Sequence, residues 1–98
     1  NFSITDEDRI LKRTLNRDKL NSWRKNIFKR DDYKCVICGQ NGYLHAHHLD
    51  GYHWCKDKRY DLNNGVTLCK EHHYTFHKKY GYKNNTKEQF EDYLKHAQ

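Results

Sequence analysis

Two short pairs of metal-binding residues constrain this chain more than any other feature. Cys35 and Cys38 form a CxxC motif, and Cys69 with His72 repeats that spacing further along the chain. Each pair can present two ligands to one ion, and three thiolates with one imidazole form the closed tetrahedral site typical of structural zinc. We therefore predict a structural zinc that ties the CxxC knuckle to the segment around Cys69.

The sequence leaves other assignments of the four cysteines open. Two disulfides are possible by count, but the sequence shows no secretion signal, and most of the eight histidines lie close to the cysteines. Cys55 could replace His72 as the fourth zinc ligand, although no partner stands near it at the pair spacing. We favour His72 and interpret Cys55 as an ordinary thiol.

Length and composition predict one small α+β domain that needs a metal to stabilise it. Among 98 residues only 35% are hydrophobic and 33% are charged, so apolar burial leaves little margin over chain entropy. No apolar run is long enough to span a bilayer, and we expect no membrane partner. The net charge of +6 favours a polyanionic partner such as nucleic acid.

The first third of the chain predicts two helices. Residues 1–20 form a charged N-terminal arm, helical over 1–18, with apolar residues loosely on one face: Ile4, Ile10, Leu11 and Leu15. Residues 21–30 form a short amphipathic helix that ends before Asp31 and packs through Trp23, Ile27 and Phe28.

The remainder predicts two strands and two more helices. We expect a strand near 43–49, a long polar loop over 50–64 and a second strand at 66–68. A helix over 70–80 follows, with Phe76 and Tyr80 in the core and Gly81 at its end. Residues 21–81 thus form a zinc-stabilised core. A capping-box pattern, Thr86 with Gln89, opens a C-terminal helix within 86–97 that packs through Phe90, Tyr93 and Leu94.

A second constellation contains histidines. His47 and His48 lie on the first strand, Asn64 precedes the second, and His73 and His77 stand four apart on the helix. At 3.6 residues per turn, His73 and His77 share a side of that helix that is rotated from the side of Cys69 and His72. One helix can therefore serve zinc on one stripe and a reaction centre on the other. We interpret His45, His53 and His96 as surface residues.

Three segments that carry these residues resemble the HNH endonucleases, a ββα-metal family, and especially its phage and homing members. The segments are WRKNIFKRDDYKCVICG, LHAHHLDGY and RYDLNNGVTLCKEHHYTFHKKYG. The resemblance implies two antiparallel strands and a helix around a divalent ion, and hydrolysis of DNA phosphodiester bonds. It also implies an intracellular protein of a bacterial host, possibly encoded by a phage.

The resemblance assigns roles by position. His48 would be the general base that takes a proton from water, a task that suits a neutral imidazole. His47, His73 and His77 would hold a catalytic ion such as Mg²⁺, Mn²⁺ or Ni²⁺. Asn64 would either orient His48 through its backbone or ligate the ion, and the sequence leaves both readings open.

Two departures from the family pattern affect the metal sites. Many relatives have Cys where this chain has His72, and Asp where it has His47. The first change keeps a zinc ligand. The second removes an anionic charge, which favours softer divalent ions at the catalytic site.

Double-stranded DNA is the expected partner, and we expect a monomer. Backbone contacts position DNA without reading its sequence, so we expect weak sequence preference and nicking before double-strand cleavage. The basic candidates for these contacts are Arg24, Lys25, Lys29, Arg30, Lys56, Lys58, Arg59, Lys78 and Lys79. The alternative is a non-catalytic zinc module that binds nucleic acid.

Overall fold

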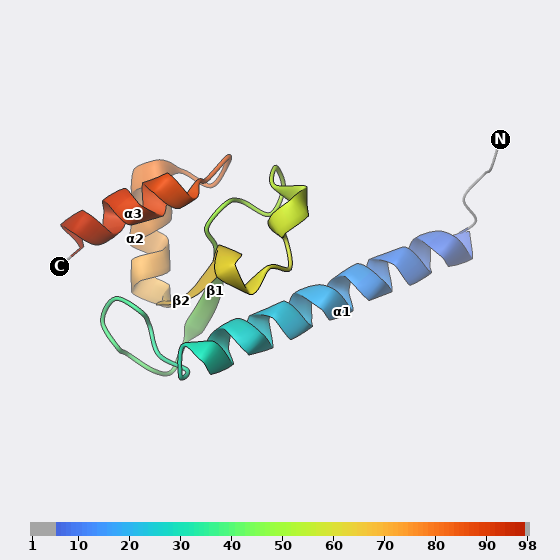
Figure 1. The fold of residues 1–98 in the computed structure, drawn as a ribbon, viewed down its shortest axis with the longest axis horizontal. Coiled ribbons are helices and arrows are strands. Elements are labelled where there is room, and N and C mark those ends of the chain that lie inside the picture. The colour runs from blue at the N-terminus through green and yellow to red at the C-terminus, as the bar shows by residue number, and fades with distance from the viewer. Residues whose placement is uncertain (1–5, 98) are drawn as a thin grey trace.

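The computed structural model describes residues 6–97, in which three helices surround a two-stranded sheet (Figure 1). In chain order the elements are α1 (Asp6–Arg30), β1 (Leu44–His48), the 3-10 turns η1 (Lys56–Lys58) and η2 (Leu62–Asn64), β2 (Gly65–Cys69), α2 (Lys70–Tyr80) and α3 (Lys87–His96). The predicted small α+β class is confirmed. No helix within residues 6–97 has the length and apolar character needed to cross a membrane.

One continuous helix stands where the sequence predicted two. The predicted break between 18 and 21 is wrong, because α1 runs through Lys19 and Leu20. Both residues favour helix, and no glycine or proline interrupts the stretch. The predicted end before Asp31 is confirmed: Asp32 and Tyr33 adopt positive φ angles of 58° and 56° and turn the chain.

Only the second half of α1 packs against the fold. Trp23 and Ile27, one turn apart, are 2% and 0% exposed, whereas Ile10, Leu11 and Leu15 are more than half exposed. The first half of the helix therefore projects beyond the rest of the molecule (Figure 1). Ile4, expected on the same apolar face, lies outside the described residues.

The sheet places consecutive histidines on opposite faces. β1 and β2 are antiparallel, with Leu44 opposite Cys69 and His48 opposite Gly65. Because side chains alternate along a strand, His47 faces α2 and His48 faces α1. Accordingly, the His47 ring contacts Phe76 of α2 at 4.6 Å between centroids, and the His48 ring contacts Trp23 of α1.

The core lies between the sheet, α2 and α3. Leu68 and Phe76 are fully buried, and Phe90 and Tyr93 of α3 close over them. Phe76 was predicted to be core, and this is confirmed. Tyr80 packs at the edge of the same cluster.

The predicted helix boundaries have the expected caps. Gly81 ends α2 with φ 80°, and its N–H donates to the His77 carbonyl. The Thr86 hydroxyl accepts from the Gln89 backbone, and the Gln89 side chain accepts from the Thr86 N–H, so the predicted capping box is confirmed. These caps set where α2 ends and where α3 begins.

Candidate functional site

The two predicted zinc pairs lie together in the fold. One possible ligand atom from each of Cys35, Cys38, Cys69 and His72 falls within 4.8 Å of the others. The Cys38 and Cys69 sulfurs are 3.8 Å apart, and His72 Nδ1 lies 3.2 Å from Cys69 Sγ and 3.9 Å from Cys35 Sγ. A tetrahedral zinc would separate such atoms by about 3.5–3.8 Å, so the donor set and its spacing fit zinc. Cys55 lies outside this cluster.

The cluster is poorly suited to three thiolates without a cation. Burial of the Cys35 thiol opposes ionisation, but the backbone N–H groups of Cys38, Cys69 and Ile37 lower its pKa below the usual range. Burial raises the pKa of Cys69 to about 11, and the neighbouring sulfurs contribute. A bound ion would remove this conflict, because coordination deprotonates each thiol.

The second group comprises His47, His73 and His77, whose ring nitrogens also fall within 4.8 Å of one another. The Nε2 atoms of His73 and His77 are 3.0 Å apart. Two adjacent ligands of an octahedral ion, each about 2.1 Å from it, would have that separation. β1 supplies the first imidazole, and α2 supplies the other two from successive turns.

Hydrogen bonding leaves ligand lone pairs directed at this space. His77 Nδ1 lies 2.8 Å from the Gly81 carbonyl oxygen, which can only accept, so the ring donates there and keeps a lone pair on Nε2. His47 Nε2 is buried and has no hydrogen-bond partner among the described residues. An unpaired buried nitrogen is costly, and a cation among the three rings would satisfy it.

Two of the three rings, those of His47 and His73, favour the neutral form that binds metal. Burial, followed by the nearby imidazoles of His73 and His77, lowers the pKa of His47 to about 3. Burial and the neighbours His77 and His45 lower the pKa of His73 to about 4. Both rings are therefore neutral near pH 7, and each keeps a lone pair on one of its two nitrogens.

His45 contacts this group of imidazoles and is half-buried, contrary to its expected place on the surface. Its Nδ1 lies 2.7 Å from Nδ1 of His73. If His73 donates in that contact, its Nε2 is the nitrogen left to bind an ion, a common arrangement behind a metal-bound imidazole. The alternation of β1 carried the missed signal, because His45 and His47 are two residues apart and share a face of the strand.

His48 occupies a different environment from His47. Its ring stacks on Trp23 with centroids 3.8 Å apart and planes 10° apart, and its Nε2 lies 2.8 Å from the Arg59 carbonyl oxygen. Since that oxygen only accepts, Nε2 carries the proton and Nδ1 keeps a lone pair. Burial lowers the pKa of His48, helped by the charges of Arg24 and Arg59 and opposed by the carbonyl contact.

Asn64 fastens the loop that holds His48. Its Nδ2 donates to the carbonyls of Asp50 and Lys58 at 2.9 and 3.1 Å, and its Oδ1 accepts from the Asp50 N–H at 2.8 Å. The amide thus makes three of its four possible hydrogen bonds, all of them to backbone groups. Because Lys58 precedes Arg59, these bonds also place the carbonyl that contacts His48.

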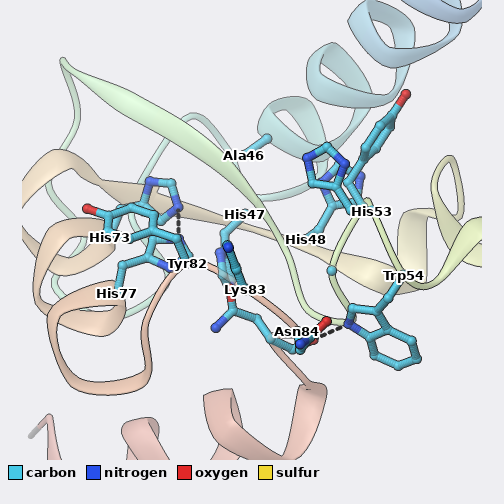
Figure 2. A pocket seen from close by; sticks show the side chains of 13 residues that line it. Ala46, His47, His48, His53, Trp54, His73, His77, Tyr82, Lys83 and Asn84 are labelled. Carbon is cyan, nitrogen blue, oxygen red and sulfur yellow. Dashed lines mark hydrogen bonds between the residues drawn. The ribbon is translucent and has the colours of Figure 1, made fainter.

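His48 and the three-imidazole group line one cavity of about 500 Å³. Its wall continues through Tyr52 to Trp54 and through Tyr82 to Asn85, and the two segments meet where the Trp54 Nε1–H donates to the Asn85 carbonyl (Figure 2). The ring of Tyr82 stacks on His77, with centroids 4.4 Å apart. The cavity therefore offers a proton acceptor and a cation site to one bound molecule.

Several basic candidates for DNA contact are engaged within the fold. Arg30 donates to the carbonyls of Leu62 and Gly65 and pairs with Asp31. The Lys58 ammonium group lies 3.3 Å from the Asp50 carboxylate. Further basic residues hold other partners: Arg59 donates to the Tyr52 carbonyl and Lys79 pairs with Asp92.

The other candidates lie open to solvent. The exposed ones are Arg24, Lys25, Lys29, Lys56 and Lys78. Among the described side chains none of these makes an ion pair, so they remain available to a polyanion.

Residues 35–80 match the family model for HNH endonuclease. The match begins at the first zinc-type cysteine and ends with α2, so it contains both candidate metal groups, His48 and Asn64. It does not distinguish phage or homing members. Comparisons with curated proteins and with solved structures gave no match.

Proposed function

Because residues 35–80 match the family model for HNH endonuclease, we propose that the chain is a metal-dependent DNA endonuclease that hydrolyses phosphodiester bonds. One observation carries the proposal: three imidazoles from β1 and α2 converge beside His48 in a single cavity. A zinc module that only binds nucleic acid would need neither the convergence nor the orphaned nitrogen of His47.

His47, His73 and His77 would hold one divalent ion such as Mg²⁺, Mn²⁺ or Ni²⁺. When bound, this ion supplies stabilisation of negative charge on the scissile phosphate and on the leaving 3′-oxygen. Three neutral nitrogen donors favour borderline ions over Mg²⁺, which prefers oxygen. His45 supports the set through its contact with His73.

His48 is the general base of the proposed reaction. The Arg59 carbonyl holds the proton on Nε2, so Nδ1 accepts a proton from water as the water attacks phosphorus. Trp23 stacks on one side of the ring and restricts its rotation. A base held this way needs no reorganisation before it accepts the proton.

Asn64 acts as an orienting residue in this proposal and does not ligate the ion. Three backbone hydrogen bonds already occupy its amide, and breaking them would leave buried polar groups of Asp50 and Lys58 unsatisfied. Its role is to hold the loop whose Arg59 carbonyl fixes the His48 tautomer.

Zinc at Cys35, Cys38, Cys69 and His72 is structural in this proposal. All four positions of a tetrahedron are filled by protein ligands, so no position is open for water or substrate. The ion would tie the knuckle before β1 to the start of α2 and thereby hold His73 opposite His47. Double-stranded DNA would lie across the cavity, held through its backbone with little sequence preference.

A plasmid assay tests the proposal. Supercoiled DNA is incubated with the parent chain in Mg²⁺, Mn²⁺ or Ni²⁺ and without an added divalent ion, beside His48→Ala and His96→Ala. His96 is an exposed α3 imidazole and serves as the matched control. We expect ion-dependent nicking by the parent and by His96→Ala, and loss of at least a hundredfold in rate in His48→Ala, as for removal of a general base.

Two results would count against the proposal. Intact plasmid with every ion would favour the non-catalytic binding module. If His48→Ala cuts as fast as the parent, the base is wrongly assigned even though the chain is a nuclease. Far-ultraviolet circular dichroism of each variant shows whether loss of the His48–Trp23 stack has altered the fold.

A further inference from the structure

The projecting helix α1 carries a charged surface that the proposed catalytic cavity does not use. Between residues 9 and 30 its sequence has nine basic residues and one acidic residue, Asp18. An isolated charge excess of this kind is often only solvated. The arrangement around the helix is therefore the informative feature.

Three arginines form a row along one side of α1. At 3.6 residues per turn, Arg13, Arg17 and Arg24 fall within about 40° of one another around the axis. All three are exposed, and among the described side chains none pairs with a carboxylate. We call these three residues the arginine row. Lys12 and Lys19 lie close together on another side of the helix, roughly 130° around the axis from the arginine row.

The arginine row begins beside His48, the proposed general base. Arg24 follows Trp23, whose indole stacks on His48. Figure 2 shows α1 passing behind the His48 end of the cavity. From Arg24 the row runs outward to Arg13 over about 16 Å of helix, because each residue rises about 1.5 Å. It therefore leads from the cavity onto the arm that projects beyond the core (Figure 1).

This geometry matches a polyanion with regularly spaced charges. Phosphates of one DNA strand recur about every 3.4 Å along the axis, so the row spans about five of them. Arginine is suited to phosphate because its planar guanidinium donates two parallel hydrogen bonds. The rises between successive arginines, about 6 Å and about 10.5 Å, correspond to roughly two and three phosphate steps.

We propose that the arginine row is a DNA-backbone track that extends the bound duplex from the scissile phosphate along α1. The inference rests on the proposed nuclease function for the location of that phosphate. It assigns a role to the arm, which the catalytic chemistry leaves without one. The row gives affinity and orientation without sequence information, since it meets phosphates and not base edges.

The test compares two pairs of substitutions on the same helix. Arg13→Gln/Arg17→Gln removes two charges from the row, and Lys12→Gln/Lys19→Gln removes two from the other stripe. Binding of a fluorescent 20-base-pair duplex to the full chain is measured by anisotropy without an added divalent ion, at several NaCl concentrations. All four positions are non-buried helix sites, so both variants should keep the parent's circular dichroism.

The row predicts unequal effects. Arg13→Gln/Arg17→Gln should weaken binding roughly tenfold or more at 0.1 M salt and should reduce the slope of log affinity against log salt by about 0.9 per lost contact. The lysine pair should change affinity less than twofold. Equal losses from both pairs would show that only overall charge matters, and no loss from the arginine pair would exclude the track; either result overturns the proposal.

The outcomes separate this inference from the proposed function. If the parent binds DNA through the arginine row but never cuts plasmid, the proposed nuclease activity is wrong and the row remains a DNA-backbone track. A parent that cuts plasmid, with the arginine pair binding like the parent, would overturn the track alone. A change in oligomeric state of the arginine variant, measured by light scattering, would place a second copy on the row instead of DNA.

Discussion

The imidazole of His48 lies face to face with the indole of Trp23, with ring centroids 3.8 Å apart. The two residues are distant in sequence, and the contact is the point where α1 meets the sheet. The Trp23 Nε1–H donates to the Asp61 carbonyl at 2.9 Å, so the indole is itself fixed by the loop before β2. A helix outside residues 35–80 thus forms one wall of the proposed catalytic group.

Trp23→Phe should slow DNA cleavage more than it weakens DNA binding. Phenylalanine keeps an aromatic face but loses the hydrogen bond to Asp61, so the His48 ring gains freedom. Loss of preorganisation at a base typically costs roughly tenfold to a hundredfold in rate. Single-turnover cleavage gives the rate, and anisotropy without divalent ion gives the affinity. Equal loss in both quantities would assign Trp23 to substrate binding or to folding.

Cys38→Ala should destabilise the chain more than Cys55→Ala, which is the opposite of the order that burial of the two side chains predicts. Cys38 is exposed and Cys55 is half-buried, so packing alone predicts that the Cys55 change costs more. If zinc is bound, Cys38→Ala removes a ligand and should unfold the domain, because structural zinc contributes about 10 kcal/mol or more of binding free energy. Thermal melts and zinc content measured by atomic emission check this. Retention of one zinc per chain in Cys38→Ala would contradict the ligand set.

Local sequence patterns predicted the elements of the core. The helix over 70–80, its Gly81 end and the Thr86 capping box are local features, decided by residues a few positions apart, and the structure has them all. The ββα order followed from alternation and helical spacing in the same way. The continuity of α1 was missed because weak hydrophobic periodicity suggested a boundary that no glycine or proline enforces.

The site was harder to predict, because its geometry depends on which face of the sheet each element covers. Consecutive strand residues point to opposite faces, so His47 faces α2 and His48 faces α1, and which helix covers each face is not readable from local sequence. His45 was placed at the surface because its contact with His73 crosses from strand to helix. The sequence also did not predict the internal partners of Arg30 and Lys58, because both contacts depend on how the loop before β2 folds back.

Acid should destabilise the chain without an added divalent ion, in part through His47. Its pKa is about 3 when folded and near 6.5 when unfolded, so below pH 6.5 the unfolded chain binds a proton that the folded chain does not. The contribution of neutral His47 to the free energy of unfolding is therefore full above pH 6.5 and is lost as the pH falls toward 3. His47→Phe, which places an aromatic ring beside Phe76 and Phe90, removes this titration.

Urea unfolding at pH 7, 6 and 5 with equal zinc content tests the pH dependence. The parent should lose more stability than His47→Phe over this range, by an amount on the order of 1–2 kcal/mol. At pH 7, Mn²⁺ should raise the melting temperature of the parent and leave that of His47→Phe unchanged. Parallel pH profiles for the two proteins would show that His47 is not a buried neutral imidazole.

Asn64→Ala should separate orientation from metal binding. The substitution removes three backbone hydrogen bonds around Asp50 and Lys58, which costs about 2–4 kcal/mol of stability. Below the melting temperature the Arg59 carbonyl is less well fixed, so His48 loses its partner and cleavage should slow by tenfold or more. The affinity for Mn²⁺ should stay within about twofold of the parent's, because the three imidazoles are untouched.

His77→Ala provides the contrast, since it removes a proposed ligand and should weaken Mn²⁺ binding by tenfold or more. Calorimetric titration of Mn²⁺ into zinc-loaded protein measures both, and an Asn64→Ala affinity as poor as that of His77→Ala would make Asn64 a ligand after all.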